Sequence, residues 1–310
     1  MAIYAAIDIG TNTLRLLIAE AVGFDHFTIL HQEQTVARLG EGLMPSRLLQ
    51  DAPMQRSLAT LGRFAETARR FNPVCVAAVA TSAVREANNR EEFVAVVRRE
   101  SGLTVRVIDG NEEARLTLLG VRHGLCLGSR RVLVMDIGGG STEFILANGE
   151  AIETMVSTGL GVVKLTEAHL KSDPPTPGEL EAIEQVVADR VRRLRVELPG
   201  LDGAALIGTA GTPTTLAAID LGLTVYSPAR VNGHRLSMIR TGQLLHTLAA
   251  RPLAERCEIP PLEPGRADVI IAGTALLVTV MGALGYDEFT VSDSGLREGI
   301  ILDLLRRHTL

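Results

Sequence analysis

One phrase of this 310-residue chain occurs twice, and it constrains the fold more than any other feature of the sequence. IDIGTNTLRLLIA (7–19) and MDIGGGSTEFILA (135–147) align without gaps, 128 positions apart. Each copy is an apolar run, a turn of glycine and small polar residues, and a second apolar run, which predicts a β-hairpin. The aligned positions pair Asp8 with Asp136, Gly10 with Gly138, and Thr13 with Ser141. The chain is therefore predicted to contain a duplicated unit.

The first half of the chain predicts alternating strands and helices in the order β-β-β-α-β-α-β-α. The three opening strands are expected to turn at Gly10–Asn12 and near Gly23–Asp25. Asn89 is placed to cap a helix, because its side chain can accept a hydrogen bond from a helical N–H group. The expected elements are three strands within 4–37, a helix over 51–71, a strand over 74–80, a helix after Asn89, a strand over 104–109 and a helix over 111–121.

The second half repeats the opening pattern, with strands across the repeated phrase and a third strand directly after it. Pro213 is expected at the first position of its helix, where proline is favoured. The later elements are two helices separated by a Pro-rich loop at 172–178, the longer within 176–198, then a strand over 205–212, a buried helix over 267–284, a strand over 288–295 and an amphipathic helix over 296–308. The last helix is expected to return to the first half of the chain.

Composition excludes several classes of function. The net charge is −5 and aromatic residues make up only 3% of the chain, without tryptophan. A non-specific nucleic-acid binder is usually basic and often stacks bases on aromatic rings, so no nucleic-acid partner is expected. The three cysteines lack metal-type spacing, which indicates a reducing compartment. No signal peptide or membrane span is predicted, and the expected location is the cytoplasm.

The tips of the two hairpins predict phosphate binding. Glycines and small hydroxyl residues allow several backbone N–H groups to converge, and such a nest binds phosphate oxygens. A plain hairpin turn is the alternative for either copy alone. The residues predicted to bind phosphate are Gly10, Thr11, Asn12 and Thr13 in the first copy, and Gly138, Gly139, Gly140, Ser141 and Thr142 in the second.

A third glycine turn, GTAGTPTT (208–215), follows an apolar strand and opens a helix. Gly208, Gly211 and Thr212 are its predicted phosphate-binding residues, since helix N-termini favour anions. The alternative is a simple strand-to-helix turn. Three such turns in a duplicated chain resemble the superfamily of sugar kinases, actin and DnaK-type chaperones. The fold expected from this resemblance is α/β, with two duplicated RNase H-like (actin-like ATPase) domains and a cleft between them.

The predicted first domain comprises residues 1–121 with 296–310, and carries the first hairpin and Glu113. The second comprises residues 122–295, and carries the second hairpin with Asp136 and Glu143. Four further stretches indicate which family within this superfamily the chain resembles. They are ATSAVREANN (80–89), DGNEEARLTLLGV (109–121), RADVIIAG (266–273) and SGLREGI (294–300). Together with the two hairpins they resemble the exopolyphosphatase and guanosine pentaphosphate phosphohydrolase family, in its short form without extra C-terminal domains.

The resemblance implies roles for individual residues. Glu113 matches the family's proposed catalytic base, and Arg85 matches an arginine that contacts substrate phosphate. Asp136 and Glu143 flank the second turn and are expected to hold Mg²⁺ or Mn²⁺, and Asp8 occupies the equivalent place in the first copy. Arg15 is a further candidate for substrate contact. Dimerisation is implied by the resemblance alone.

Each of these residues also has a structural alternative. Glu113 could be a helix-start residue, as is expected of its neighbour Glu112, because acidic side chains favour helix N-termini. Glu143 could be a solvated strand residue, and Arg85 and Arg15 could be surface arginines. Arg266 and Arg297 are expected either at the site or in structural ion pairs.

The function predicted from the sequence is metal-dependent release of orthophosphate from the end of inorganic polyphosphate, which makes the protein a hydrolase of phosphorus-containing anhydrides. Guanosine pentaphosphate is the related substrate. One alternative is a phosphotransferase of the same superfamily, which would deprotonate an acceptor hydroxyl instead of water. The other is a non-catalytic sensor of polyphosphate or nucleotide.

Overall fold

The computed structural model describes residues 2–23 and 25–309, so the expected turn near Gly23–Asp25 includes Phe24, which lies outside the described residues. The chain divides into two units. The first is residues 1–120 with 295–310, and the second is residues 121–294. Each unit is a mixed α/β sheet with helices, which agrees with the expected fold class. The roles assigned to the two domains, and the cleft between them, stay predictions.

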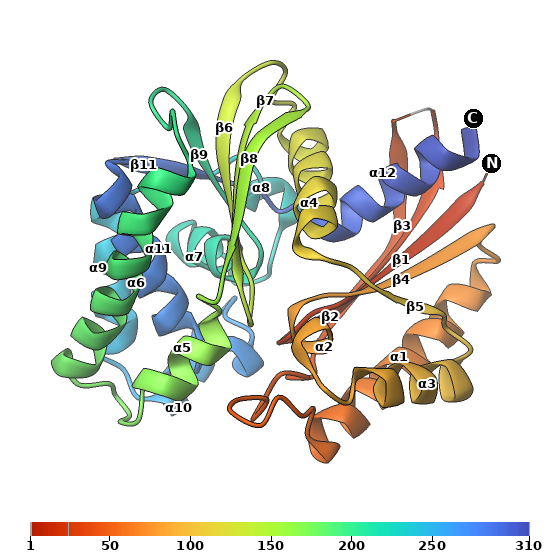
Figure 1. Ribbon diagram of the computed structural model, residues 1–310, viewed down its shortest axis with the longest axis horizontal. Helices are drawn as coiled ribbons and strands as arrows, with labels where there is room; N and C mark the ends of the chain where they lie inside the picture. The colour runs from red at the N-terminus through yellow and green to blue at the C-terminus, as the bar shows by residue number, and fades with distance from the viewer. Residues whose placement is uncertain (1, 24, 310) are drawn as a thin grey trace. The chain divides into compact units, whose positions relative to one another are not determined.

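The first unit is built on a five-stranded sheet in the order β3-β2-β1-β4-β5 (Figure 1). The first three strands form an antiparallel meander, and β4 and β5 run parallel to β1. These strands are β1 (Ile3–Ile9), β2 (Thr13–Ala21), β3 (Phe27–Val36), β4 (Cys75–Ala80) and β5 (Val105–Val107).

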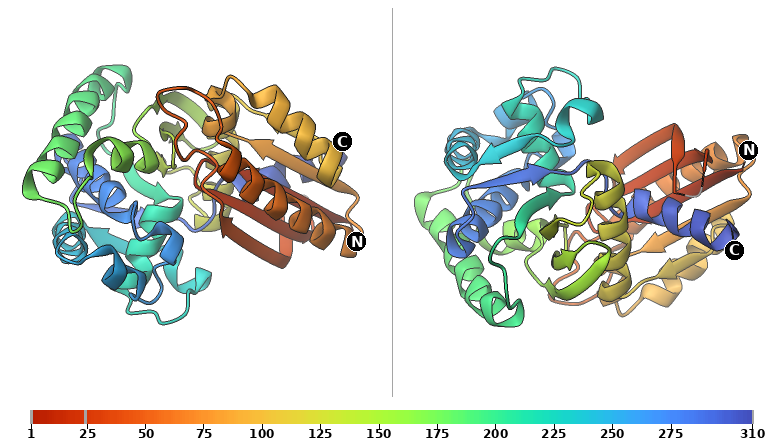
Figure 2. Two further views of the ribbon diagram at one scale, coloured as in Figure 1. Left: turned by 90° about the horizontal axis from the view of Figure 1, so that it is seen from below. Right: turned by 90° about the horizontal axis from the view of Figure 1, so that it is seen from above.

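Helices cover both faces of this sheet, because successive side chains of β1 and β2 point to opposite sides and both sides are apolar. Ala5, Ile7 and Leu16 pack in one cluster with residues of α1 and α3. Tyr4 and Leu17 pack in another cluster with residues of α12, which returns from the end of the chain (Figure 2). The helices are α1 (Asp51–Arg70), α2 (Ser82–Glu86), α3 (Arg90–Ser101), α4 (Gly110–Leu125) and α12 (Leu296–Thr309).

The second unit repeats this topology and extends it. Its six-stranded sheet has the order β10-β11-β9-β6-β7-β8, in which β6, β7 and β8 form the meander and β9 and β11 run parallel to β6. The duplication predicted from the sequence is therefore present in the strand order. The strands are β6 (Arg131–Ile137), β7 (Thr142–Asn148), β8 (Ala151–Thr158), β9 (Ala205–Thr209), β10 (Arg235–Ser237) and β11 (Glu288–Val291).

The core of the second unit surrounds α11, whose side chains are buried nearly all round. A helix of this kind must lie inside a protein, because no polar face is left for water. It contacts α6 and α9, and packs with Leu133 and Met135 of β6. The helical segments are α5 (Val162–His169), α6 (Pro177–Glu197), α7 (Gly211–Asp220), α8 (Pro228–Val231), α9 (Met238–Ala249), α10 (Leu253–Cys257), the short 3₁₀ helix Pro264–Arg266 and α11 (Ile270–Leu284).

Two details differ from expectation. Asn89 precedes α3, but its side chain does not cap the helix. Its amide oxygen instead accepts a hydrogen bond from the N–H of Leu49 at 2.9 Å, and its amide nitrogen donates to the carbonyl of Leu49 at 3.1 Å. Pro213 is the third residue of α7 and not the first, because the helix already begins at Gly211. The sequence pattern also did not predict the short elements α2, α8, β10 and α10, or helix α9.

Over the part of the chain that the structure describes, no helix combines the length and the apolar character needed to cross a membrane. The most apolar helix, α11, is a core helix of the second unit.

The start of α6 gives a testable feature of stability. The carboxylate of Glu179 accepts hydrogen bonds from the N–H groups of Thr176 (2.7 Å), Lys171 (2.7 Å) and Ser172 (2.9 Å). The bonds from Thr176 and Lys171 contribute most to lowering the pKa of Glu179 from 4.5 to about 2. These bonds favour the ionised form of Glu179. Its contribution to the stability of the fold is therefore complete above pH 4.5 and is lost as the pH falls through 2.

Replacing Glu179 by Gln is expected to lower the melting temperature at pH 7, because an amide offers one acceptor oxygen where the carboxylate offers two. The difference from wild type should shrink as the pH falls from 4.5 toward 2, measured by differential scanning calorimetry across that range. Glu181→Gln removes the same charge from an exposed position one turn or less away and serves as control. A pH-independent difference would contradict this assignment.

Candidate active site

The carboxyl ends of parallel strands collect the predicted residues of the first unit at one edge of the sheet. Ile9, Ala80 and Val107 end β1, β4 and β5, and these strands are neighbours in register. The hairpin tip follows the first strand, Arg85 the second and Glu113 the third. This edge is where open α/β sheets bind ligands, so the topology brings together residues that are about a hundred positions apart in sequence.

The tip of the first hairpin is closed by a backbone bond from Gly10 N–H to Thr13 O at 3.2 Å. A Cβ atom on Gly10 would lie only 2.8 Å from that same oxygen, so the turn requires glycine there. Asp8 and Arg15 stand directly opposite each other on β1 and β2, and their side chains form an ion pair at 3.4 Å. The carboxylate of this hairpin is thus balanced by a guanidinium group from the second strand of the same hairpin.

Glu113 lies in the first turn of α4 with its residue surface only 7% exposed. Its carboxylate accepts a hydrogen bond from Arg85 Nη1 at 2.8 Å, and the same nitrogen donates to the carbonyl of Ile108 at 3.0 Å. Arg85 therefore connects the end of β4 to the segment between β5 and α4. A charge-assisted bond of this kind holds a carboxylate in a defined orientation.

The neighbouring carboxylates have different surroundings. Asp109 Oδ1 accepts a hydrogen bond from the N–H of Glu112 at 2.8 Å, and so satisfies a donor at the start of α4. Glu112 forms an ion pair with Arg106 on β5 and is more exposed than Glu113. The structure thus separates the adjacent glutamates, because one faces solvent beside an arginine and the other is buried against Arg85.

The second unit gathers its residues in the same way, at the ends of β6, β9 and β11. Gly138 N–H donates to Ser141 O at 2.9 Å, which repeats the closure of the first hairpin. Asp136 and Glu143 stand directly opposite each other on β6 and β7. Glu143 is buried and accepts a hydrogen bond from the hydroxyl of Ser157 on β8 at 2.7 Å.

The two hairpins therefore differ in charge at one equivalent position, which is arginine at 15 and glutamate at 143. Like charges directly opposite on a sheet destabilise it, so the pair Asp136–Glu143 favours a cation more than the pair Asp8–Arg15 does. Among the described residues, no group of three or more His, Cys, Asp or Glu side chains could hold a metal ion. Two opposed carboxylates suit Mg²⁺, which is usually bound through one or two carboxylates and otherwise by waters and substrate phosphate.

The third turn has a different construction. Gly208 lies inside β9, where a Cβ atom would come within 2.9 Å of the Phe289 ring, so it supports the turn by packing. Gly211 begins α7 directly after Ala210, a non-glycine residue with a positive φ of 72°. A Cβ on Gly211 would lie 2.7 Å from a guanidinium nitrogen of Arg266, which places that arginine over the turn.

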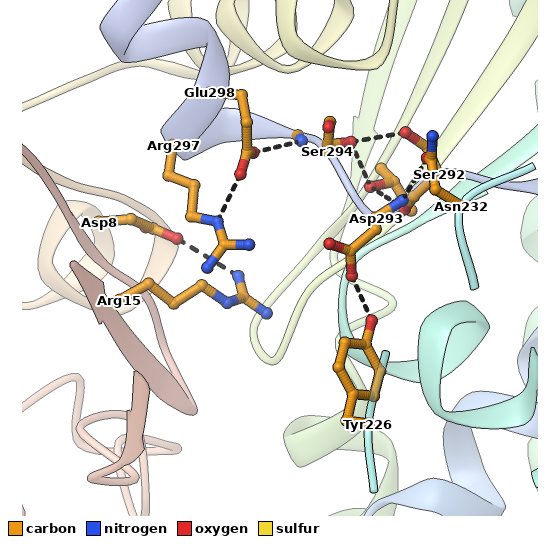
Figure 3. A network of polar contacts seen from close by, with 11 residues as sticks. Asp8, Arg15, Tyr226, Asn232, Ser292, Asp293, Ser294, Arg297 and Glu298 are labelled. Atoms are coloured by element: carbon orange, nitrogen blue, oxygen red, sulfur yellow. Dashed lines mark hydrogen bonds and ion pairs between the residues drawn. The ribbon is translucent and has the colours of Figure 1, made fainter. Parts of the chain in front are cut away.

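Arg266 and Arg297 both take part in ion pairs, as the structural alternative for them predicts. Arg266 pairs with Glu263 at 3.1 Å, and Arg297 with Glu298 at 2.6 Å. Figure 3 shows Arg297 and Glu298 at the start of α12, together with the pair Asp8–Arg15 of the same unit. Glu298 also accepts a bond from the N–H of Gly295 at 2.8 Å, so it anchors the start of this helix.

In the second unit, the segment 292–294 is tied to the end of β9. The hydroxyl of Thr209 donates to the carbonyls of Ser292 and Ser294, each at 3.1 Å. Asn232 accepts from the N–H of Asp293 at 3.1 Å, and Asp293 pairs with Tyr226 (Figure 3). These contacts hold the carboxyl ends of β9 and β11 together at the edge where the second hairpin and third turn lie.

Sequence reasoning missed three contributors to this arrangement. Ser157 orients Glu143, Asp109 caps the helix that carries Glu113, and Thr81 joins β4 to the first hairpin by donating its N–H to Ile9 O at 3.2 Å. None of these stands within the repeated phrase. Only Asp109 had a usable signal, because an Asp directly before a helix is a common capping residue. The roles predicted for the site residues stay predictions.

The fold and site define a duplicated α/β protein with two glycine-tipped hairpins, and comparisons with known proteins agree with it. The model of the Ppx/GppA phosphatase family matches residues 17–308. The chain is 33% identical to Exopolyphosphatase 2 of Mycobacterium tuberculosis, over 97% of this chain and 98% of that protein.

Solved structures give the same result. A Ppx/GppA protein of Aquifex aeolicus superposes with a TM-score of 0.84 at 32% identity, over 100% of this chain and 99% of that one. An exopolyphosphatase of Cytophaga hutchinsonii superposes with a TM-score of 0.91 at 29% identity, over 98% and 97% of the two chains. The chain belongs to the Ppx/GppA phosphatase family.

The opposed carboxylates of the second hairpin lead to a prediction about divalent cations. Mg²⁺ added with orthophosphate is expected to raise the melting temperature of wild type and to have a much smaller effect on Glu143→Gln, because one ligand is lost. In EDTA the variant should be as stable as wild type or more stable by about 0.2–1 kcal/mol, since a like-charge pair is removed. Its amide oxygen can still accept the bond from Ser157.

Glu153→Gln is the matched control, because Glu153 also lies in this meander but pairs with Arg131 near the opposite end of the strands. Its response to Mg²⁺ should equal that of wild type. An equal Mg²⁺ response in Glu143→Gln would show that Glu143 is not a ligand.

Proposed function

We propose that this protein is an exopolyphosphatase, which hydrolyses the terminal phosphoanhydride of inorganic polyphosphate and releases orthophosphate. Membership of the Ppx/GppA phosphatase family and the similarity to proteins named exopolyphosphatase support this proposal. The observation that carries it is the buried carboxylate of Glu113, held by Arg85 at the sheet edge where the first glycine hairpin ends. Guanosine pentaphosphate is a second candidate substrate, because its 5′ end presents the same phosphoanhydride.

The chemistry requires a carboxylate that accepts a proton from water, and donors that stabilise the charge of the phosphoryl oxygens. Glu113 supplies the first. Arg85 is a positioning residue for Glu113, and its guanidinium can also bind a phosphate oxygen. The tips of the hairpins supply backbone N–H groups, which bind an anion without adding net charge. This explains how a chain of net charge −5 can bind a polyanion.

Asp136 and Glu143 are the residues that would hold Mg²⁺ or Mn²⁺. Bound there, the ion would neutralise charge on the phosphoryl oxygens and raise the electrophilicity of phosphorus. Ser157 keeps Glu143 oriented for that role through its hydroxyl. Asp8 is paired with Arg15, so we assign it to the support of the first hairpin and of a phosphate-binding guanidinium.

Glu113→Gln is expected to lower kcat on polyphosphate by about 10²–10⁴-fold, with KM changed little, because an amide cannot accept the proton but keeps the shape of the side chain. Orthophosphate release with Mg²⁺ present measures this. The neighbouring Glu112→Gln is the matched control, since it removes the same charge from the same helical turn, and it should retain near-normal activity.

Near-normal turnover by Glu113→Gln would refute its assignment as the base. Product analysis in the presence of ADP separates hydrolysis from phosphotransfer, because a transferase would form ATP in place of free orthophosphate. Tight polyphosphate binding by wild type without any turnover would instead indicate a sensor.

A further inference from the structure

Both glycine hairpins are held from one side by the segment that follows the third strand of their repeat. In the first unit, Gly40 N–H donates to Thr11 O at 2.8 Å, and Arg38 N–H donates to Asn12 O at 2.9 Å. In the second unit, Val163 N–H donates to Gly139 O at 2.9 Å, and Val162 N–H donates to Gly138 O at 3.0 Å. We call residues 38–40 and 161–163 the backing segments.

The backing segments are equivalent parts of the duplication, although their sequences do not align visibly. Thr35 on β3 stands opposite Leu14, and Thr158 on β8 stands opposite Thr142, which is the aligned position of the second repeat. Gly40 and Val163 each follow their threonine by five positions. Each donates to the same position of its hairpin tip, which is Thr11 in one copy and Gly139 in the other.

These bonds determine where the N–H groups of the tips point. The peptide bonds concerned are trans, and a trans peptide directs its C=O and N–H in opposite directions. Because the carbonyls of Gly138 and Gly139 point at the second backing segment, the N–H groups of Gly139 and Gly140 point away from it. By the same argument the N–H of Asn12 points away from the first backing segment.

In the second unit the donors are the first two residues of α5. The first N–H groups of a helix have no partner inside the helix and carry partial positive charge. Here the carbonyls of the hairpin tip accept hydrogen bonds from these N–H groups, and a phosphate bound by the N–H groups of the same two peptides would extend the chain of hydrogen bonds. Such chains polarise one another, which strengthens the outer donors.

Close packing shows that each backing segment is fitted to its own tip. A Cβ on Gly40 would lie 2.3 Å from Thr11 Cγ2. The residues at the equivalent positions of the second copy are Val163 and Gly139, which are joined by the backbone bond from Val163 N–H to Gly139 O. In the first unit the backing segment has glycine (Gly40) and the tip has threonine (Thr11). In the second unit the backing segment has valine (Val163) and the tip has glycine (Gly139). A Cβ on Gly161 would lie 2.2 Å from the carbonyl carbon of Gly140 and 2.3 Å from the oxygen of Gly139.

We propose that Gly40 and Gly161 are positioning residues of the phosphatase reaction, which let the backing segments turn the carbonyls of the two tips away and so aim the N–H groups at substrate phosphate. The inference rests on the proposed function for the identity of the substrate. The orientation of the peptides can be tested separately, by anion binding.

The first test uses Gly40→Ala, whose closest contact is the Thr11 methyl group and whose φ is open to alanine. Displacing the tip is expected to lower kcat/KM on polyphosphate about tenfold or more, mainly through a higher KM. Thr11→Ser removes the obstructing methyl and keeps the hydroxyl. The double variant should therefore recover to within about threefold of Thr11→Ser alone, which a double-mutant cycle measures.

The second test compares Gly161→Ala with Gly159→Ala. Gly159 lies two residues earlier, has no atom within 4 Å of an added Cβ, and is not among the positive-φ residues, so its variant should behave as wild type. Gly161→Ala meets backbone of the tip and should raise KM about tenfold or more, with unchanged circular dichroism. If this variant does not fold, the Gly40 cycle still decides the question.

Binding of tripolyphosphate, measured calorimetrically without Mg²⁺, separates this inference from the proposed function. Weakened binding by Gly40→Ala, restored in the double variant, supports the positioning role even if wild type has no polyphosphatase activity. Binding and KM that match wild type in both glycine variants would overturn it, as would a loss of binding that a smaller folded fraction fully accounts for. Wild type that neither binds tripolyphosphate nor hydrolyses polyphosphate would overturn both proposals.

Discussion

The antiparallel register of the first hairpin in each repeat is the constraint on which the rest of the site depends. It places position 8 opposite 15 and position 136 opposite 143, and it leaves the same glycine-closed turn between them. A shift of one residue would move every side chain of a strand to the other face of the sheet. Because a shifted Arg15 would point into the apolar cluster that packs on α1 and α3, burial of these strands fixes the register and keeps the pair Asp8–Arg15 at the carboxyl edge.

One architecture carries two charge patterns in this duplicated protein. In the first copy, Asp8 faces a guanidinium that belongs to the protein. In the second copy, Asp136 stands opposite the buried carboxylate of Glu143, which is the pair that would hold a divalent cation under the proposed function. Under the proposed function, the two copies would have different tasks: direct binding of phosphate in one, and metal-assisted binding in the other.

Much of the arrangement could be predicted because its signals are local. Apolar runs on both sides of a glycine turn predict the hairpins, helical spacing predicts α1, and the Asp109–Glu113 stretch places a glutamate at a helix start. Other parts had no local signal. Asn89 has the sequence of a helix cap, yet it bonds Leu49, because a loop distant in sequence offers it two backbone partners. The backing segments have different residues at equivalent positions, so only the hydrogen bonds reveal their equivalence.

The sequence by itself determined the duplication, the alternation of strands and helices, and the types of residue that stand at each turn. These follow from periodicity and turn chemistry, which act over a few residues. Tertiary structure decided which residues meet: Arg85 with Glu113, Ser157 with Glu143, and each backing segment with its hairpin tip. The physical reason is that these contacts join separate strands and helices, and their geometry depends on parallel strand pairing and core packing that no short stretch of sequence contains.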